Sequence, residues 1–390
     1  MFRDILYRFS NLPSLSFANL LRFAAYRHFY KKLVAKKIID ADGSLMQSRF
    51  SKASAGRASG AGHRHLVCIT GFGWSGSGAV RDVLEEYDNT TVTYPLDGQG
   101  TKSHCPEFDL LKAAGGLFEL ERAFEDGNIF IRDAAVRLFL SLVRNLYIDT
   151  PGLYNDDFIV ATREFLDGIM DFKSVAHGGY GFCHNYAPLG KGGERLVFGS
   201  PCEEGGTGYL FYLKDLTRQE FRVHAKAYLS RVFGTFPSKD YLVLDQALSD
   251  YQADLAKYRD YLGPFKLICV FRDPRDVYAM KLNNPSIDWI PSEPTAFVKW
   301  YEHAHRKSLS VRSDDFMMVF FGDLFTDYEG TVRRIENFVG LDSSQHVRPK
   351  TKFDPAVSIK NVGIYKAYEN DPRMKIVSEG MPEFVREALK

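Results

Sequence analysis

Short apolar runs that end in polar or glycine-rich breaks mark the candidate strands of this chain. Four runs are rich in branched or aromatic residues and are each followed by such a break, which is typical of buried strands; they cover 66–70, 241–244, 265–271 and 317–321. Apolar residues at helical spacing follow the first run from Ala79 and the last run from Tyr328, and Gly340 is placed to end the second of these helices. Strands that alternate with helices predict an α/β fold with a central, mostly parallel sheet.

A different pattern fills the region between the first two strands. Over roughly 100–240, apolar residues recur at helical spacing, interrupted by glycine-rich stretches at 176–182 and 199–209. We therefore expect a helical insertion within a single α/β domain that covers 65–370. The stretch 199–209 is either a lid over a site or a plain surface loop.

A glycine- and serine-rich break follows the first strand; it reads Gly71-Phe72-Gly73-Trp74-Ser75-Gly76-Ser77-Gly78. Glycine lets backbone amides approach an anion closely, the start of the next helix adds partial positive charge, and the serines offer hydroxyl donors. A Walker A loop would need a lysine at the position of Ser77, which disfavours an ATPase or a kinase. The break predicts an anion site, and the alternative is a glycine-rich turn that binds no ligand.

The strand 265–271 ends abruptly in Arg272-Asp273-Pro274-Arg275-Asp276. These arginines lie at the carboxyl end of a strand, where open α/β sheets bind ligands. The guanidinium of Arg272 can hold a phosphate with two parallel hydrogen bonds, which a lysine cannot do. The alternative is a cluster of ion pairs that caps a helix, with Asp276 in its first turn.

Four segments together resemble the P-loop sulfotransferase family. The run from Trp74 to Gly78 is similar to the family's 5′-phosphosulfate loop, and Arg272 stands where the family has the arginine for the 3′-phosphate of 3′-phosphoadenosine 5′-phosphosulfate. The segments 317–341 and 358–366 resemble the family's late strand and helix and its C-terminal nucleotide segment. All four occur in the family's order.

This resemblance implies a P-loop NTPase-like, three-layer α/β/α fold, with 3′-phosphoadenosine 5′-phosphosulfate as cofactor and transfer of its sulfuryl group to a hydroxyl acceptor. The acceptor would be a glycan, a lipid-linked sugar or a small metabolite, recognised by the region of roughly 100–240. The implied cofactor-binding residues are Gly73, Trp74, Ser75, Gly76, Ser77, Gly78, Arg272, Ser358, Lys360 and Tyr365.

The chain departs from the family at several of these positions. Trp74 replaces the basic residue that neutralises charge on the sulfuryl group and its leaving phosphate, so either Lys102 or Arg163 supplies that charge or the protein binds nucleotide without efficient transfer. Met280 replaces a serine of the 3′-phosphate site, and Gly322 replaces a glutamate. The residues that could compensate for Met280 are Ser286, Asn283 and Asn284.

Sulfuryl transfer also needs a base that takes the proton of the acceptor hydroxyl. The candidates are His104 and Glu107, in a polar stretch after the loop, and Asp245, at the end of the strand 241–244. No histidine has metal-ligand spacing with the cysteines, so we expect no metal. Two further classes stay open: a catalytically degenerate nucleotide-binding protein of the same fold, and a nucleotide-dependent kinase.

Composition fits a soluble enzyme of 390 residues, 45% hydrophobic and 25% charged. The 50 lysines and arginines nearly balance the 49 acidic residues, which argues against a nucleic-acid partner. The five cysteines are scattered, and two of them lie within expected strands, which favours a reducing compartment. We find no apolar run long enough to cross a bilayer and no signal-peptide pattern, so we expect the cytoplasm.

The N-terminal segment has its own charge pattern. Residues 1–40 hold eight lysines and arginines against two aspartates, interleaved with aromatic and aliphatic residues. Such a segment, which we extend over 1–50, could contact an anionic membrane surface or pack on the domain as an ordinary helix. A linker at 51–64 follows it, and we expect a tail at 371–390.

Overall fold

The structure is a computed structural model, and it describes residues 65–71, 74–92, 110–125, 128–149, 154, 156–177, 207–234, 236, 239–245, 255–287 and 289–385. The described residues form two compact units. Those from 110 to 234 form one, which we call the helical unit, and those from 65 to 92 together with 236 to 385 form the other, which we call the sheet unit. The basic segment 1–50 and the linker 51–64 of the sequence analysis lie outside the described residues.

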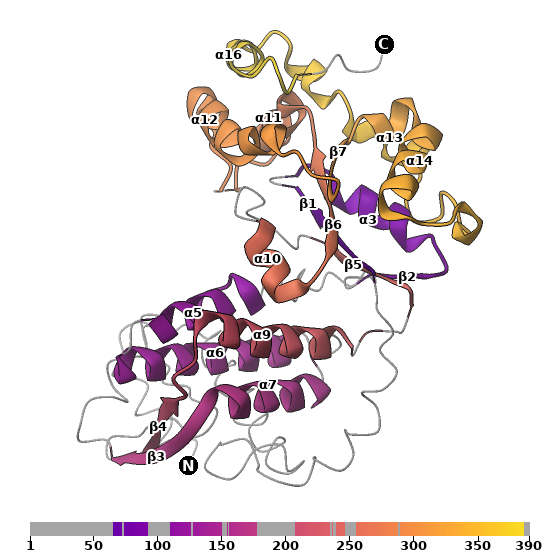
Figure 1. Ribbon diagram of the computed structural model, residues 1–390. Helices are drawn as coiled ribbons and strands as arrows, with labels where there is room; N and C mark the ends of the chain where they lie inside the picture. The colour runs from indigo at the N-terminus through magenta and orange to yellow at the C-terminus, as the bar shows by residue number, and fades with distance from the viewer. Residues whose placement is uncertain are drawn as a thin grey trace, which may run out of the picture. The chain divides into compact units, whose positions relative to one another are not determined.

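A five-stranded sheet organises the sheet unit (Figure 1). Its strands are β1 (His65–Thr70), β2 (Thr90–Val92), β5 (Tyr241–Asp245), β6 (Phe265–Phe271) and β7 (Phe316–Phe320). They pair in the order β2-β5-β1-β6-β7, and every pair is parallel. The predicted α/β class with a parallel sheet is therefore confirmed. Because such a sheet is covered on both faces, its inner strands are continuous apolar runs rather than alternating ones.

Helices cover both faces of this sheet and complete the expected three layers (Figure 1). Alternate residues such as Val67 and Ile69 of β1 share a core with Val83 and Ile335 from the helices on one face. Phe271 of β6 instead meets the ring of His305 on the other face. One face carries α3 (Ser77–Glu85), α13 (Asp323–Thr326) and α14 (Tyr328–Val339), and the other carries α11 (Pro274–Asn283), α12 (Pro294–His305) and α16 (Pro372–Gly380).

Shorter elements connect these layers. Gly340 ends α14 in the left-handed conformation, with φ 86°, as the sequence predicts. The connecting elements are α10 (Leu255–Leu262), η2 (Arg306–Ser310), η3 (Ser343–Gln345), α15 (Pro355–Ser358), η4 (Ile359–Asn361) and η5 (Ile364–Tyr368).

The segment expected as a C-terminal tail contributes to the core. Residues 372–380 form α16, and the side chains of Met374, Val377, Met381 and Phe384 are all buried. The ring of Phe384 lies 5.3 Å from that of Tyr301 in α12. Burial of these four apolar side chains stabilises the sheet unit, since each removes apolar surface from water.

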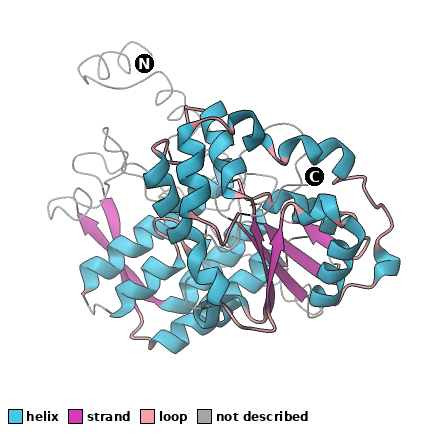
Figure 2. Ribbon diagram, turned by 90° about the horizontal axis from the view of Figure 1, so that it is seen from above, coloured by secondary structure: helices cyan, strands magenta, loops and turns pink. Residues whose placement is uncertain are grey.

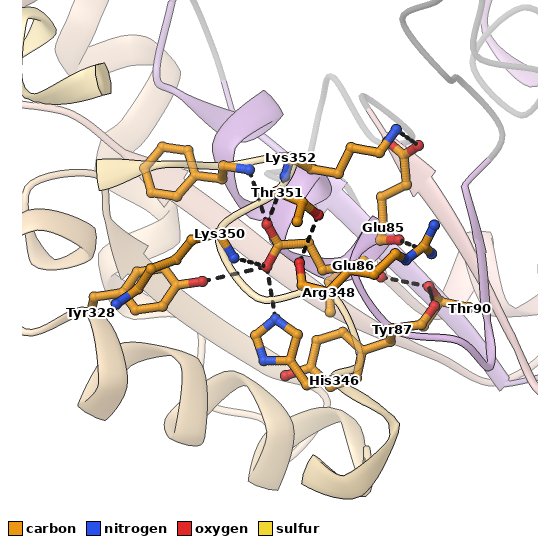
Figure 3. Close-up of polar contacts among 12 residues, drawn as sticks. Glu85, Glu86, Tyr87, Thr90, Tyr328, His346, Arg348, Lys350, Thr351 and Lys352 are labelled. Carbon is orange, nitrogen blue, oxygen red and sulfur yellow. Dashed lines mark hydrogen bonds and ion pairs between the residues drawn. The ribbon is translucent and has the colours of Figure 1, made fainter. Parts of the chain in front are cut away.

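The buried carboxylate of Glu86 anchors the chain segment that follows α14 (Figure 3). Glu86 follows α3 and is fully buried. Its oxygens accept hydrogen bonds from the backbone N–H groups of Lys350, Lys352 and Phe353 at 3.0, 2.9 and 3.1 Å, and Nε2 of His346 lies 2.7 Å away. A buried carboxylate that is paired in this way holds chain segments about 260 residues apart in sequence together.

Helices also make up most of the helical unit, as Figure 2 shows. Their apolar faces meet in an aromatic core, in which the rings of Phe165 and Tyr228 stack 4.9 Å apart. The elements are α5 (Leu117–Glu125), α6 (Ile129–Asp149), α7 (Asp156–Ile169), α9 (Arg218–Phe233) and the antiparallel strands β3 (Met170–His177) and β4 (Thr207–Leu213). Within the described ranges, none of the helices is both long and apolar enough to cross a membrane.

Candidate functional site

The sheet topology makes the carboxyl ends of β1 and β6 the candidate ligand site. The chain leaves β1 through α3 toward β2 on one side of the sheet, and it leaves β6 toward β7 on the other side. Ligands of open α/β sheets bind outside the carboxyl ends of two such neighbouring strands. Thr70 and Cys269 are register partners near these ends, so the loop after Thr70 and the arginine after Phe271 start side by side.

The loop after β1 needs glycine at two positions. A Cβ at Gly71 would overlap the hydroxyl of Ser75, so the backbone passes closely over that side chain. Gly76 has φ 90°, and a Cβ there would overlap the ring of Phe321. Trp74 adopts φ 58° although it has a large side chain, a strained conformation of the kind that gathers at functional sites. Gly73 lies outside the described residues.

The start of α3 provides donors for an anion. Gly76 is the N-cap and offers no side-chain cap, and the first turn of α3 holds no acidic residue. Ser75 is buried, and its Oγ has no hydrogen-bond partner among the described residues. Ser77 is also buried. A helix N-terminus with an unpartnered buried hydroxyl beside it has the composition of an anion site.

Arg272 brings a buried positive charge to the same loop. It is 5% exposed, and its Nη1 donates to the carbonyl of Trp74 at 3.3 Å. Its Nη2 donates to the carbonyl of Asn361. No carboxylate of the described residues lies within ion-pair distance of Arg272, and its Nε is buried without a partner. Burial lowers the pKa of Arg272, and the nearby charges of Asp276 and Asp273 oppose that shift.

Asp276 ties the C-terminal segment to the same strand end. Its carboxylate accepts hydrogen bonds from the backbone N–H groups of Gly363 at 3.0 Å and Tyr365 at 3.2 Å. Burial raises the pKa of Asp276, although the two hydrogen bonds and the positive charge of Arg272 oppose that shift. Arg275 stacks over the ring of Tyr365 at 3.9 Å and pairs with Asp273 at 2.6 Å. Arg275 thus forms an ion pair, whereas the hydrogen bonds of Arg272 go to backbone carbonyls.

The remaining C-terminal candidates lie next to these contacts along the chain. Ser358 ends α15 and is half-buried, and Lys360 is exposed within η4. Both precede Asn361, the residue whose carbonyl accepts from Arg272. The predicted C-terminal segment is therefore anchored at the carboxyl end of β6, and contact of Ser358 and Lys360 with a phosphate stays a prediction.

Met280 contacts Arg272 even though it cannot donate a hydrogen bond. Its Sδ lies 2.8 Å from Nη1 of Arg272. The residues expected to compensate make other contacts: Nδ2 of Asn284 donates to the carbonyl of Met280 at 2.9 Å, and Asn283 accepts from the hydroxyl of Tyr368. Ser286 is exposed. In the described part of the chain, none of these three residues contacts Arg272.

Asp245, the candidate base at the end of β5, is buried. Its register partner in the neighbouring strand β1 is Ile69. Its Oδ2 lies 3.4 Å from Nη1 of Arg81, which also contacts Asp82 at 2.5 Å. Arg81 was not among the residues expected from the sequence. In the sequence, Arg81 stands three residues after Gly78, so the two residues lie on the same face of the first turns of α3. This spacing is the signal that could have indicated Arg81.

The other catalytic candidates stay predictions. Arg163 lies in α7 of the helical unit, where its Nε is 3.5 Å from Oδ2 of Asp167. His104, Lys102 and Glu107 lie outside the described residues. In the described ranges, no group of three or more histidine, cysteine, aspartate or glutamate side chains could hold a metal ion.

The solved structures that are similar to this chain include two sulfotransferases. Sulfotransferase STF9 from Mycobacterium avium is 12% identical, with TM-score 0.34, and the alignment covers 82% of this chain and 76% of that one. The sulfotransferase domain of the olefin synthase from Synechococcus PCC 7002 is 12% identical, with TM-score 0.35, and the alignment covers 84% of this chain and 92% of that one. No family model and no curated protein matches the sequence.

Proposed function

We propose that this protein binds 3′-phosphoadenosine 5′-phosphosulfate and transfers its sulfuryl group to a hydroxyl acceptor. The observation that supports the proposal best is Arg272, a buried cation that contacts the glycine-rich loop through the carbonyl of Trp74. A buried guanidinium beside a loop of this kind can hold a phosphate with charge-assisted hydrogen bonds.

Each part of the site has a role in this reaction. The helix start at Gly76 and the hydroxyl of Ser75 would hold the phosphosulfate end, and Arg272 would hold the 3′-phosphate. When bound, the cofactor would supply the sulfuryl group to the acceptor oxygen, with its 5′-phosphate as the leaving group, and the hydroxyl proton would pass to a base. Among the described candidates for that base, Asp245 lies on the neighbouring strand.

Trp74 leaves the loop without a basic side chain, because the indole cannot neutralise charge. The Arg272 guanidinium lies against the backbone of that residue, 3.3 Å from its carbonyl oxygen. Because we assign Arg272 to the 3′-phosphate, charge compensation at the sulfuryl end stays assigned to Lys102 or Arg163.

The second candidate function is a nucleotide-binding protein without transfer chemistry, which the replacement of the basic residue by Trp74 favours. The test is release of 3′-phosphoadenosine 5′-phosphate from 3′-phosphoadenosine 5′-phosphosulfate, compared between wild type, Ser75→Ala and Ser308→Ala. Ser308 is a matched control because it is a fully buried serine outside the loop.

We expect release that is insensitive to chelators, lowered about tenfold or more by Ser75→Ala and unchanged by Ser308→Ala, because a hydrogen bond to a charged group contributes about 1.5–3 kcal/mol. Tight binding without release would favour the degenerate protein. If neither 3′-phosphoadenosine 5′-phosphosulfate nor 3′-phosphoadenosine 5′-phosphate binds, both candidate functions are refuted.

A further inference from the structure

The ring of Phe321 contacts two separate parts of the candidate anion site. Phe321 follows β7, and its backbone N–H donates to the carbonyl of Phe271, the last residue of β6, at 2.7 Å. The Cζ atom of Arg272 lies 5.1 Å from the centre of the Phe321 ring, within the range of a cation–π contact. The same ring packs so closely on Gly76 that a Cβ there would overlap it. One side chain therefore touches both the buried cation and the start of α3.

The sheet topology explains how one ring reaches both groups. In the strand order β1-β6-β7, the loop of Gly76 follows the first strand, Arg272 follows the second and Phe321 follows the third. The guanidinium of Arg272 also donates to the carbonyls of Trp74 and Asn361. Because such hydrogen bonds act in the plane of the guanidinium, the aromatic ring adds a contact that they do not supply.

The Phe321 ring is itself held in place by other rings. It is 6% exposed and belongs to the core on its face of the sheet. Phe325 meets it edge-on at 5.0 Å with an interplanar angle of 71°, and Phe353 lies 5.7 Å from Phe325. The backbone N–H of Phe353 donates to the anchoring carboxylate of Glu86 at 3.1 Å. A ring packed in this way cannot move aside without disturbing its neighbours.

We propose that Phe321 is a positioning residue that fixes the distance between the start of α3 and the guanidinium of Arg272. This inference rests on the proposed function for the identity of the ligand, whereas the positioning itself needs only the contacts of the ring. Two anion-binding groups held at one distance favour a ligand whose two phosphates have that spacing, because neither group has to move on binding. Phe321 therefore selects 3′-phosphoadenosine 5′-phosphate over 2′-phosphoadenosine 5′-phosphate, an isomer of the same charge.

The first test compares binding of these two isomers by calorimetry. The proteins are wild type, Phe321→Leu, Phe321→Tyr and Phe325→Leu. Leucine keeps an apolar side chain beside Gly76 but has no aromatic face for the guanidinium, whereas tyrosine keeps that face. Phe325 is a matched control because it belongs to the same group of rings, and its described ring contacts are with Phe321 and Phe353.

We expect wild type to bind the 3′-phosphate isomer about tenfold more tightly than the 2′-phosphate isomer. Phe321→Leu should lower this preference about fivefold, mainly through lost affinity for the 3′-phosphate isomer, and Phe321→Tyr should keep it. Phe325→Leu should lower the midpoint of denaturant unfolding and leave the preference unchanged. A purely structural role of Phe321 would instead weaken binding of both isomers alike.

The second test needs no nucleotide. In protein that contains isotopically labelled arginine, the side-chain N–H resonance of Arg272 is identified as the one that is lost in Arg272→Gln. The ring current of Phe321 should displace this resonance in the free protein. We expect Phe321→Leu to shift it, and Phe321→Tyr and Phe325→Leu to leave it close to its wild-type position.

Two results would overturn the positioning role: equal losses for the two isomers in Phe321→Leu, or an Arg272 resonance that does not respond to Phe321→Leu. Equal binding of both isomers by wild type would overturn the selection that we assign to the ring. If neither isomer binds wild type while the Arg272 resonance still depends on Phe321, the proposed function falls and the positioning stands.

Discussion

Substitution of Arg272 by glutamine should separate binding of the 3′-phosphate from stability of the fold. Arg272→Gln removes the buried positive charge but keeps a donor near the carbonyls of Trp74 and Asn361. In the free protein, the cost of burying the Arg272 charge and its attraction to Asp276 and Asp273 oppose each other, so loss of the charge should change the free energy of unfolding by less than about 1 kcal/mol. A bound phosphate would add a favourable partner for the Arg272 charge, so the same substitution should weaken binding.

Charge-assisted hydrogen bonds to phosphate are worth about 1.5–3 kcal/mol, which corresponds to roughly ten- to 150-fold in affinity. Calorimetry should show that loss for 3′-phosphoadenosine 5′-phosphate and a much smaller one for AMP, which has no 3′-phosphate. The matched control is Arg275→Gln, because Arg275 follows the same strand but is paired with Asp273 and stacked on Tyr365.

Arg275→Gln should therefore lower stability more than it lowers affinity. Equal losses for 3′-phosphoadenosine 5′-phosphate and AMP, or a loss below about threefold for the first, would refute the role of Arg272.

Three further outcomes follow from the described contacts. Gly76→Ala should lower nucleotide affinity and cost about 1–3 kcal/mol of stability in denaturant unfolding, because Gly76 has φ 90° and a Cβ there would overlap the ring of Phe321. Gly78→Ala should change neither the affinity nor the stability. Glu86→Gln should cost about 2 kcal/mol or more, because an amide nitrogen would face backbone donors; an unchanged unfolding midpoint would contradict this. Burial lowers the pKa of His305 to about 3 from 6.5, so the unfolded chain takes up a proton between these values that the folded chain does not. Stability should be complete above about pH 6.5 and fall as the pH is lowered, by about 2 kcal/mol at pH 5, and His305→Leu should flatten that dependence.

The parts of the fold that the sequence predicts are those with a local cause. The apolar runs of β1 and β6 are buried on both faces and therefore visible as continuous patterns, and Gly340 ends α14 where the periodicity stops. Placement of Arg272 at a strand end could also be predicted, because it needs only the end of the run.

Contacts between distant residues could not be predicted in this way. Asp276 lies in the first turn of α11, as the sequence indicates, whereas its bonds to Gly363 and Tyr365 span more than 80 residues and have no sequence signal. Glu86 and His346 have no sequence pattern that links them, and their contact depends on how α3 and α14 pack. Periodicity describes one element at a time, whereas these bonds depend on the arrangement of several elements.

The buried segment 371–385 was missed for a related reason. Its apolar residues Met374, Val377, Met381 and Phe384 are spaced by three or four, which is a helical pattern, but the segment is short and follows the last motif. The place of this segment in the core depends on contacts with distant rings, such as that of Tyr301. A short amphipathic segment near a terminus is thus better treated as a candidate part of the core.

One calorimetric comparison tests the central claim most directly. Wild-type protein is titrated separately with 3′-phosphoadenosine 5′-phosphate, AMP and Mg-ATP under the same salt conditions. Because Arg272 offers a buried positive charge beside the glycine-rich loop, we predict that 3′-phosphoadenosine 5′-phosphate binds at least about tenfold more tightly than AMP and more tightly than Mg-ATP. Equal affinities for 3′-phosphoadenosine 5′-phosphate and AMP, or the tightest binding by Mg-ATP, would contradict the claim that this site recognises the sulfuryl-transfer cofactor.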